Sequence, residues 1–155
     1  MPLSQSHLSQ LSSQLDGLQI LLSNFSNSDL RKRPPNGKWS VHEQVCHITR
    51  TQDVFFERFE KIIAERMPPK IERYSAEEDK DWPNLIQRST ETTLDNLFRK
   101  RKELVEYISQ VRDGDLKKKG IHNAFGELTL ETWIEFFLAH EAHHFYSIIK
   151  LLAYK

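Results

Sequence analysis

Apolar residues recur along the chain at steps of three and four, the period of an amphipathic helix. The clearest stripe contains Leu8, Leu11, Leu15, Leu18, Leu22 and Phe25. Glycine, proline and polar clusters separate this stripe from three later ones. The pattern predicts four helices, over residues 8–25, 40–67, 85–111 and 129–155. No segment shows sustained alternation of the kind that indicates a strand.

Local signals mark the ends of the second helix. Ser40 is followed three residues later by Glu43, the spacing of a capping box. Met67-Pro68-Pro69 stops the same helix, because proline cannot continue the hydrogen-bond ladder. The connection over residues 70–83 is polar, and residues 117–128 are predicted to be a loop.

Four helices with one apolar stripe each can bury those stripes only against one another. The sequence therefore predicts an all-α fold, a four-helix bundle. With 155 residues, the chain is expected to form a single domain over residues 1–155. Because two connections are long, a crossover is compatible with the pattern.

Composition removes several classes of partner. The chain has 22 basic and 22 acidic residues, whereas a nucleic-acid binder normally carries a basic excess. No stretch approaches the roughly 18 apolar residues of a membrane span. The first residues have neither a basic start nor an apolar segment, so we expect no secretory signal. A single cysteine, Cys46, fits a reducing cytoplasm, and it is expected to be a small buried apolar residue.

The last predicted helix contains His140-Glu141-Ala142-His143-His144, which spells H-E-x-x-H. His140 and His144 lie one turn apart on the apolar stripe of this helix. Their ring nitrogens need polar partners in a core, and a metal ion is one such partner. The alternative is a pair of core histidines that bond to side chains or water. His143 points about 100° away from both and is expected to flank the site.

A zinc protease is disfavoured by the position of the motif. The common kinds take a third ligand from a residue downstream of H-E-x-x-H. The segment after His144, FYSIIKLLAYK, contains no aspartate, glutamate, histidine or cysteine.

A third ligand must then come from upstream, where spacing leaves several histidines open. His42 falls in the first turn of its helix and is expected to be exposed, and His122 falls in a loop. The candidates are His47, His42, His122 and His7.

Three motifs together resemble the DinB/YfiT superfamily. They are W-S-x-x-E-x-x-x-H over residues 39–47, H-x-x-F-G-E-L-T-L over 122–130 and H-x-x-H-H over 140–144. The resemblance implies a four-helix bundle with a crossover, often a homodimer. It also implies a divalent metal held by His47, His140 and His144. Ser147 departs from the family pattern, which commonly has glutamine there.

The resemblance also suggests an activity. Characterised members of the family include S-transferases and isomerases that use low-molecular-weight thiols other than glutathione. Three neutral ligands favour an anionic fourth ligand, so thiolate or hydroxide attack on a small-molecule substrate would suit such a site. Imidazole suits zinc or nickel, and iron or manganese also accept it.

Two other interpretations stay open from the sequence. Glu141 is a candidate general base, or a residue that orients a ligand imidazole, but a rim glutamate paired with a lysine or arginine is the alternative. The protein is expected to be a metal-dependent S-transferase or hydrolase. A non-catalytic bundle that binds metal or assembles with itself is the alternative, and so is a family member whose histidines are merely core residues.

Overall fold

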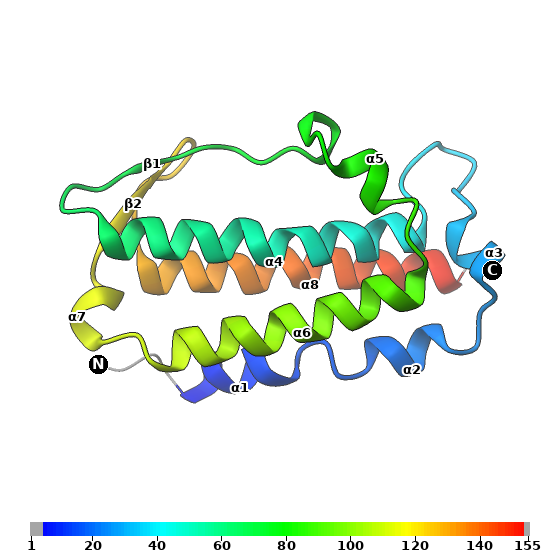
Figure 1. The fold of residues 1–155 in the computed structure, drawn as a ribbon, viewed down its shortest axis with the longest axis horizontal. Coiled ribbons are helices and arrows are strands. Elements are labelled where there is room, and N and C mark those ends of the chain that lie inside the picture. Colours follow the sequence, from blue (N-terminus) through cyan, green and yellow to red (C-terminus); the bar gives the residue numbers. More distant parts are fainter. Residues whose placement is uncertain (1–4, 154–155) are drawn as a thin grey trace.

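The computed structural model describes residues 5–153 and shows the predicted four-helix bundle (Figure 1). Long helices α4, α6 and α8 form three sides, and the broken segment α1–α2 forms the fourth. In chain order the elements are α1 (Gln5–Ser13), α2 (Leu18–Leu22), α3 (Asn27–Arg31), α4 (Val41–Ala64), β1 (Lys70–Ile71), the 3₁₀ turn η1 (Ala76–Glu78), α5 (Trp82–Leu85), α6 (Thr90–Ser109), α7 (Asp113–Leu116), β2 (Lys119–His122), β3 (Gly126–Thr129) and α8 (Leu130–Ala153).

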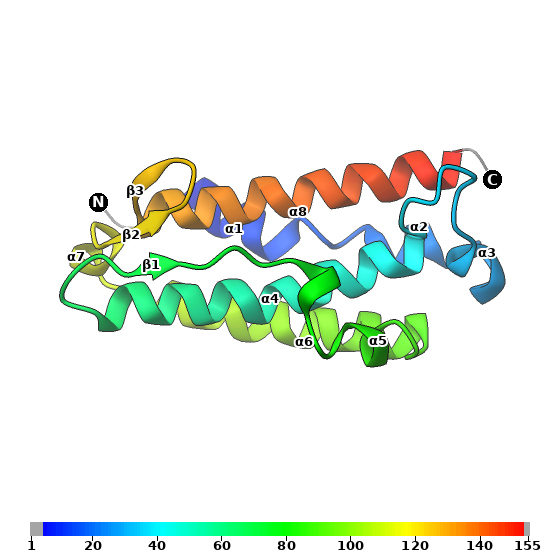
Figure 2. The same cartoon turned by 90° about the horizontal axis from the view of Figure 1, so that it is seen from above.

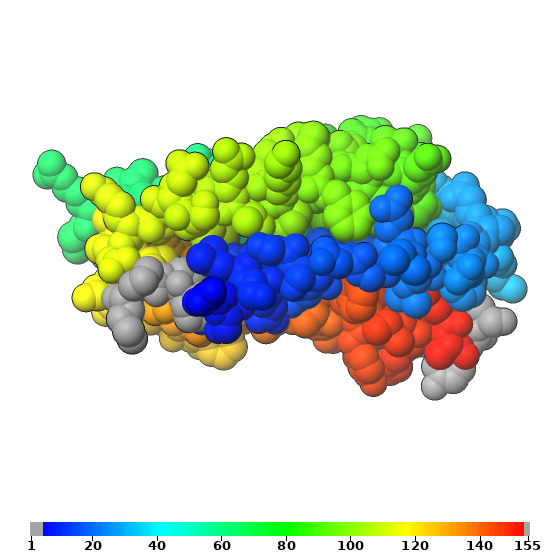
Figure 3. All heavy atoms as spheres, turned by 90° about the horizontal axis from the view of Figure 1, so that it is seen from below, coloured from blue at the N-terminus to red at the C-terminus, as the bar shows by residue number. Residues whose placement is uncertain are grey.

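A crossover sets the order of the helices. The connection over residues 65–81 runs back along the whole length of α4, so α4 and α6 point in the same direction (Figures 1 and 2). The helix α8 runs opposite to α4 beside it. Seen from below, the segment α1–α2 lies between α6 and α8 (Figure 3).

The predicted start of α4 is confirmed. The Ser40 hydroxyl accepts from the Glu43 backbone N–H at 3.2 Å, and the Glu43 carboxylate accepts from the Ser40 N–H at 2.8 Å. Arg33 holds the same carboxylate from the preceding loop. This start matters to function because it fixes the first turns of the helix that carries His47.

The first helix is not continuous, contrary to the prediction. α1 ends at Ser13 and α2 begins at Leu18, although the apolar stripe continues through the break. The Leu11 carbonyl accepts a hydrogen bond from Arg101 Nη1 at 2.9 Å, and Gly17 precedes α2. Because periodicity records only which face is buried, it did not reveal this interruption.

The third predicted helix also begins later than expected. Residues 82–85 form the short helix α5, and α6 starts at Thr90 with Ser89 as its N-cap. The Ser89 hydroxyl accepts from the Thr92 N–H at 3.0 Å. Ser89 is thus the start signal that the sequence interpretation overlooked.

A small sheet replaces the predicted loop over residues 117–128. Strands β2 and β3 form an antiparallel hairpin, and β1 pairs with β2 in parallel. Gly126 adopts a φ of 72°, which favours glycine at this turn. Strands of two to four residues are too short to show alternation, so the sequence pattern did not predict them.

Among the described residues the core forms two large apolar clusters, one toward each end of the bundle, and a small third one of Cys46, Ala76 and Trp82. Along all four sides of the bundle, one polar residue marks the boundary between the two large clusters: Gln14, Gln52, Arg101 and Glu141.

These four polar residues bond to one another. The Glu141 carboxylate accepts from Gln14 Nε2 and Gln52 Nε2, both at 2.9 Å, and pairs with the Arg101 guanidinium. Arg101 Nε also donates to Gln52 Oε1 at 3.0 Å. A buried polar network therefore joins all four sides of the bundle at one level.

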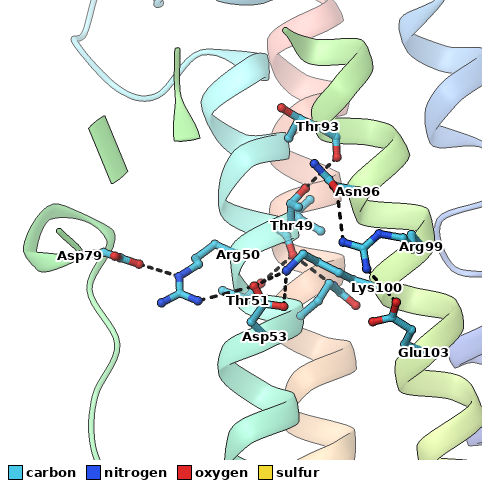
Figure 4. Close-up of polar contacts among 12 residues, drawn as sticks. Thr49, Arg50, Thr51, Asp53, Asp79, Thr93, Asn96, Arg99, Lys100 and Glu103 are labelled. Carbon is cyan, nitrogen blue, oxygen red and sulfur yellow. Dashed lines mark hydrogen bonds and ion pairs between the residues drawn. The ribbon is translucent and has the colours of Figure 1, made fainter. Parts of the chain in front are cut away.

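The outer face of α4 and α6 carries a second, more exposed set of ion pairs (Figure 4). Arg50 Nε donates to Asp79 Oδ2 at 2.8 Å, and Lys100 pairs with Asp53. Arg99 pairs with Glu103 one turn later in α6. In the part of the chain that the structure describes, no helix combines the length and apolar character needed to cross a membrane.

We expect Gly120→Ala in β2 to lower the free energy of unfolding by about 1–3 kcal/mol, because overpacking strains a filled core. An added Cβ would lie 2.8 Å from Ile62 Cγ1 and 3.0 Å from Trp133 Nε1. Gly114→Ala in α7 is the control, since its Cβ would meet nothing within 4 Å. Urea denaturation of both variants measures the effect, and equal stabilities would contradict this account of the packing.

Candidate metal centre

The antiparallel pairing of α4 and α8 brings three histidines together. His47 Nε2 lies 3.3 Å from His140 Nε2, and His144 Nε2 lies 3.2 Å from the same atom. One ligand atom from each of the three lies within 4.8 Å of the other two. The candidate ligand set of the sequence interpretation therefore forms one cluster, which we call the histidine triad.

The Gln44 side chain fixes the orientation of one ring. Gln44 Oε1 lies 2.7 Å from His144 Nδ1, and an amide oxygen can only accept. His144 Nδ1 therefore carries the ring proton and donates a hydrogen bond to Gln44. His144 Nε2 then presents a bare lone pair to His140. Hydrogen-bonded support of this kind is what orients metal-binding imidazoles in proteins.

The arrangement fits a metal ion better than a hydrogen-bonded core. His140 Nε2 can donate a hydrogen bond to only one of its two neighbours, His47 Nε2 and His144 Nε2. At one of the two contacts the nitrogen lone pairs therefore face each other. His47 Nδ1 and His140 Nδ1 are buried without a hydrogen-bond partner in the described chain. Tetrahedral zinc with Zn–N bonds of about 2.0–2.1 Å places its nitrogens ~3.3 Å apart, close to the two separations measured from His140 Nε2.

The triad is neutral at pH 7. Burial lowers the pKa of His47 and His140 to about 4, and that of His144 to about 3, with neighbouring positive charge adding to each shift. Neutral imidazole is the form that binds a metal, so no proton has to leave the triad before an ion enters.

Aromatic rings surround the triad. The Trp39 ring lies 4.9 Å from that of His47 and 6.3 Å from that of His144, and Tyr74 stacks on His47 at 5.8 Å. Trp82 packs against Trp39 at 5.2 Å. The sequence interpretation placed none of these rings beside the triad: Trp39 entered it only through the motif over residues 39–47, and Tyr74 and Trp82 belong to the long polar connection before α6.

One side of the triad opens into a cavity of about 300 Å³. His47 and His140 line it, together with Phe55 and Trp133. The connection containing β1 and the β2–β3 hairpin form the rest. A space of this volume suits a small molecule.

Glu141 lies in a different place from the one expected. Its side chain is buried, and its carboxylate is held by Arg101, Gln14 and Gln52. Among the described residues, no contact joins this carboxylate to the triad. The prediction of a pairing with arginine is right, but the pair lies in the core and not at a rim.

The other candidate histidines are separate from the triad. His42 is 1% exposed, which corrects the expectation of an exposed residue, and its ring bonds to Thr90 Oγ1 and the Ile86 carbonyl. His7 lies 3.2 Å from Glu135. His143 is exposed, as expected of a flanking residue, whereas His122 lines the far part of the cavity.

Cys46 is buried, as expected, and burial raises the pKa of its thiol to about 11. The sulfur lies 3.4 Å from His42 Nε2 and does not point into the triad's cavity. A thiol with this pKa is protonated at pH 7, so Cys46 is not an activated nucleophile.

The family model of the DinB superfamily matches residues 10–148. The chain belongs to the DinB superfamily. Its bundle is also similar to that of YfiT from Bacillus subtilis, described as a probable metal-dependent hydrolase with an unusual four-helix bundle topology. The TM-score is 0.80 at 21% identity, over 94% of this chain and 83% of that one. No curated protein matches the chain.

The place of Glu141 predicts the effect of removing its charge from this DinB-family bundle. We expect Glu141→Ala to lower the free energy of unfolding by about 3–5 kcal/mol, because Arg101 would stay buried without its partner. The folded fraction should still bind metal. Denaturation and metal content measure the two effects, and the exposed Glu103, paired with Arg99, gives a control variant with little effect. Normal stability with lost metal binding would instead assign Glu141 to the metal site.

The neutral triad predicts a pH dependence of the metal-free protein. Between pH 6.5 and about 4, the unfolded chain binds protons on His47, His140 and His144 that the folded chain does not bind. The free energy of unfolding should therefore fall as the pH falls through this window. Thermal melts of chelator-treated protein at pH 7.5 and 4.5 measure it. His140→Gln, with one titrating ring fewer, should show a smaller fall; an identical fall would contradict the assigned cause.

Proposed function

We propose that this protein is a metal-dependent enzyme that activates a small nucleophile at the histidine triad. The observation that carries the proposal is the cavity, because two of the three imidazoles line it. A purely structural metal site is normally closed by four protein ligands, whereas a catalytic site keeps a position open. Here three ligands converge and the remaining side faces a space for substrate.

The donor set supports zinc or nickel as the ion, with iron or manganese as further candidates. Such an ion, held by three neutral ligands, would lower the pKa of a thiol or water bound beside it. The chain supplies the ligands His47, His140 and His144, and Gln44 holds the His144 ring in its ligating tautomer. The rings of Trp39 and Tyr74 cover part of the triad, and Tyr74 also lines the cavity.

The groups around the cavity favour thiol transfer over hydrolysis. Hydrolysis of an amide or an ester ends with a leaving group that needs a proton from a nearby acid. The Tyr74 hydroxyl is engaged by Asp79 Oδ2 at 3.0 Å, and burial raises its pKa above the ordinary value. The Thr51 hydroxyl donates to the Ile48 carbonyl. When a low-molecular-weight thiol attacks an electrophile, the thiol proton goes to solvent, the carbon–sulfur bond forms and the bond to the leaving group breaks. A leaving group that departs as a stable anion needs no acid from the chain.

Hydrolysis is the second candidate, supported by the likeness to YfiT, which is described as a probable metal-dependent hydrolase. A bundle that binds metal without catalysis is the third. The homodimer and the cytoplasmic location expected from the sequence stay predictions.

We expect purified protein, prepared without an affinity tag or chelator, to contain about one metal ion per chain, as a single triad allows. His144→Ala should contain little metal, because it removes one of three ligands. His143→Ala is the matched control, since His143 is adjacent in sequence but exposed, and it should keep the metal. Elemental analysis of the three proteins makes the comparison.

The same proteins test the reaction. The parent and His143→Ala should consume a low-molecular-weight thiol in the presence of an alkylating electrophile, and His144→Ala should not. Ester cleavage without thiol consumption would favour the hydrolase. Tight metal binding with neither reaction would favour the non-catalytic bundle.

A further inference from the structure

Arg58 is a cation that lines the cavity without an acidic partner. It is partly buried, and burial lowers the pKa of its guanidinium from the ordinary value. Nη2 donates to the Glu72 backbone carbonyl at 2.8 Å. Among residues 5–153, no carboxylate forms an ion pair with it. Arginine keeps its charge in proteins, so an uncompensated positive charge faces the cavity.

The other partly or fully buried basic residues of α4 and α6 are each paired with a carboxylate. Figure 4 shows Arg50 with Asp79 and Lys100 with Asp53 on the outer face of these helices. Arg101 is paired with Glu141 in the core. Among the described residues of these two helices, Arg58 is therefore the one basic residue that is at least partly buried and has no carboxylate partner. A half-buried arginine that lacks such a partner is placed to receive an anion from outside the chain.

His122 supplies a second donor to the same cavity. Its Nδ1 accepts from the backbone N–H groups of Ala124 at 3.0 Å and Phe125 at 3.3 Å. Both contacts require a bare Nδ1, so in the neutral ring the proton lies on Nε2. Nε2 makes no hydrogen bond within the described residues. The hairpin turn thus fixes a tautomer that offers an N–H to the cavity.

Shared aromatic rings relate the two donors to the triad. Arg58 Cζ lies 4.8 Å from the Phe55 ring, and the His140 ring lies 5.9 Å from that same ring. Arg58 Cζ also lies 5.8 Å from the Trp133 ring, which His122 contacts at 5.4 Å. One aromatic ring therefore separates the guanidinium from the triad.

We propose that the substrate of this site is a small molecule with a carboxylate, which Arg58 and His122 bind while its apolar body lies on Phe55 and Trp133. A guanidinium presents two parallel N–H groups to a planar carboxylate, and the aromatic wall suits a flat body. This arrangement leaves the reacting end of the molecule toward His47 and His140. The orientation of the reacting end toward the triad rests on the proposed function, whereas the binding of the carboxylate by Arg58 and His122 does not.

Binding of trans-cinnamate, compared with its neutral amide, tests the subsite. The titration follows the indole N–H signals of ¹⁵N-labelled protein, with the Trp133 signal assigned from Trp133→Phe. In chelator-treated protein, we expect cinnamate to bind about tenfold more tightly than cinnamamide, as a charge-assisted contact provides. Arg58→Gln should reduce cinnamate to the affinity of the amide, and Arg58→Lys should be intermediate. His122→Phe should weaken cinnamate by a smaller factor.

Arg73→Gln is the matched control, because Arg73 also lines the cavity but is exposed. It should leave cinnamate binding unchanged. Equal affinities for acid and amide in the parent would overturn the proposal, as would equal losses from Arg58→Gln and Arg73→Gln. Repeating the titration with zinc-loaded protein locates the carboxylate: binding that needs zinc and ignores Arg58 would also overturn it. An inert triad would defeat the proposed function but leave the metal-free titration unaffected.

Discussion

The buried ion pair between Arg101 and Glu141 is the constraint on which the rest of the bundle depends. A buried pair costs several kcal/mol in desolvation, and good geometry with further hydrogen bonds is needed to offset that cost. Here Gln14, Gln52 and the Leu11 carbonyl supply those bonds. A slide of α6 or α8 by one turn would leave a buried charge unpaired, and a slide of α4 or of the segment α1–α2 would remove hydrogen bonds from that pair. The network therefore defines the register of the four sides more strictly than apolar contacts alone would.

The register set by this network places the histidines. In α8, His140 is the residue before Glu141, and in α4, His47 lies five residues before Gln52. Once Gln52 bonds to Glu141, the neighbouring faces of the two helices bring His47 against His140. The core thus holds two polar groups at nearly one level. One is charged and fully compensated within the chain, whereas the other is neutral and turns its Nε2 atoms toward one another.

The sequence predicted those features that follow from periodicity or local capping. The apolar stripes indicated four helices, and Ser40 with Glu43 located the start of α4. The helical positions of Glu141 and His42 did not reveal their surroundings, since these depend on Arg101 from α6 and on Thr90 at its start. The interruptions of the stripes by polar residues were the available signal for the network. The sequence carried no comparable signal for Arg58 and His122. They line one cavity because the crossover and the hairpin bring distant parts of the chain together, and no regular sequence spacing records that.

Arg58 lies on α4, the helix that also carries the triad residue His47. His47, Thr51, Phe55 and Arg58 line the cavity from one face of α4. At 1.5 Å per residue, the Cα atoms of His47 and Arg58 are about 16 Å apart, and long side chains lean toward the helix N-terminus. Arg58 does so, since its guanidinium lies over Phe55, three residues earlier. A rigid helix therefore fixes the separation between the triad and the positive charge. Such a separation selects substrates by the distance between their anionic group and their reacting atom, and exchanging the loops around the cavity would leave that distance unchanged.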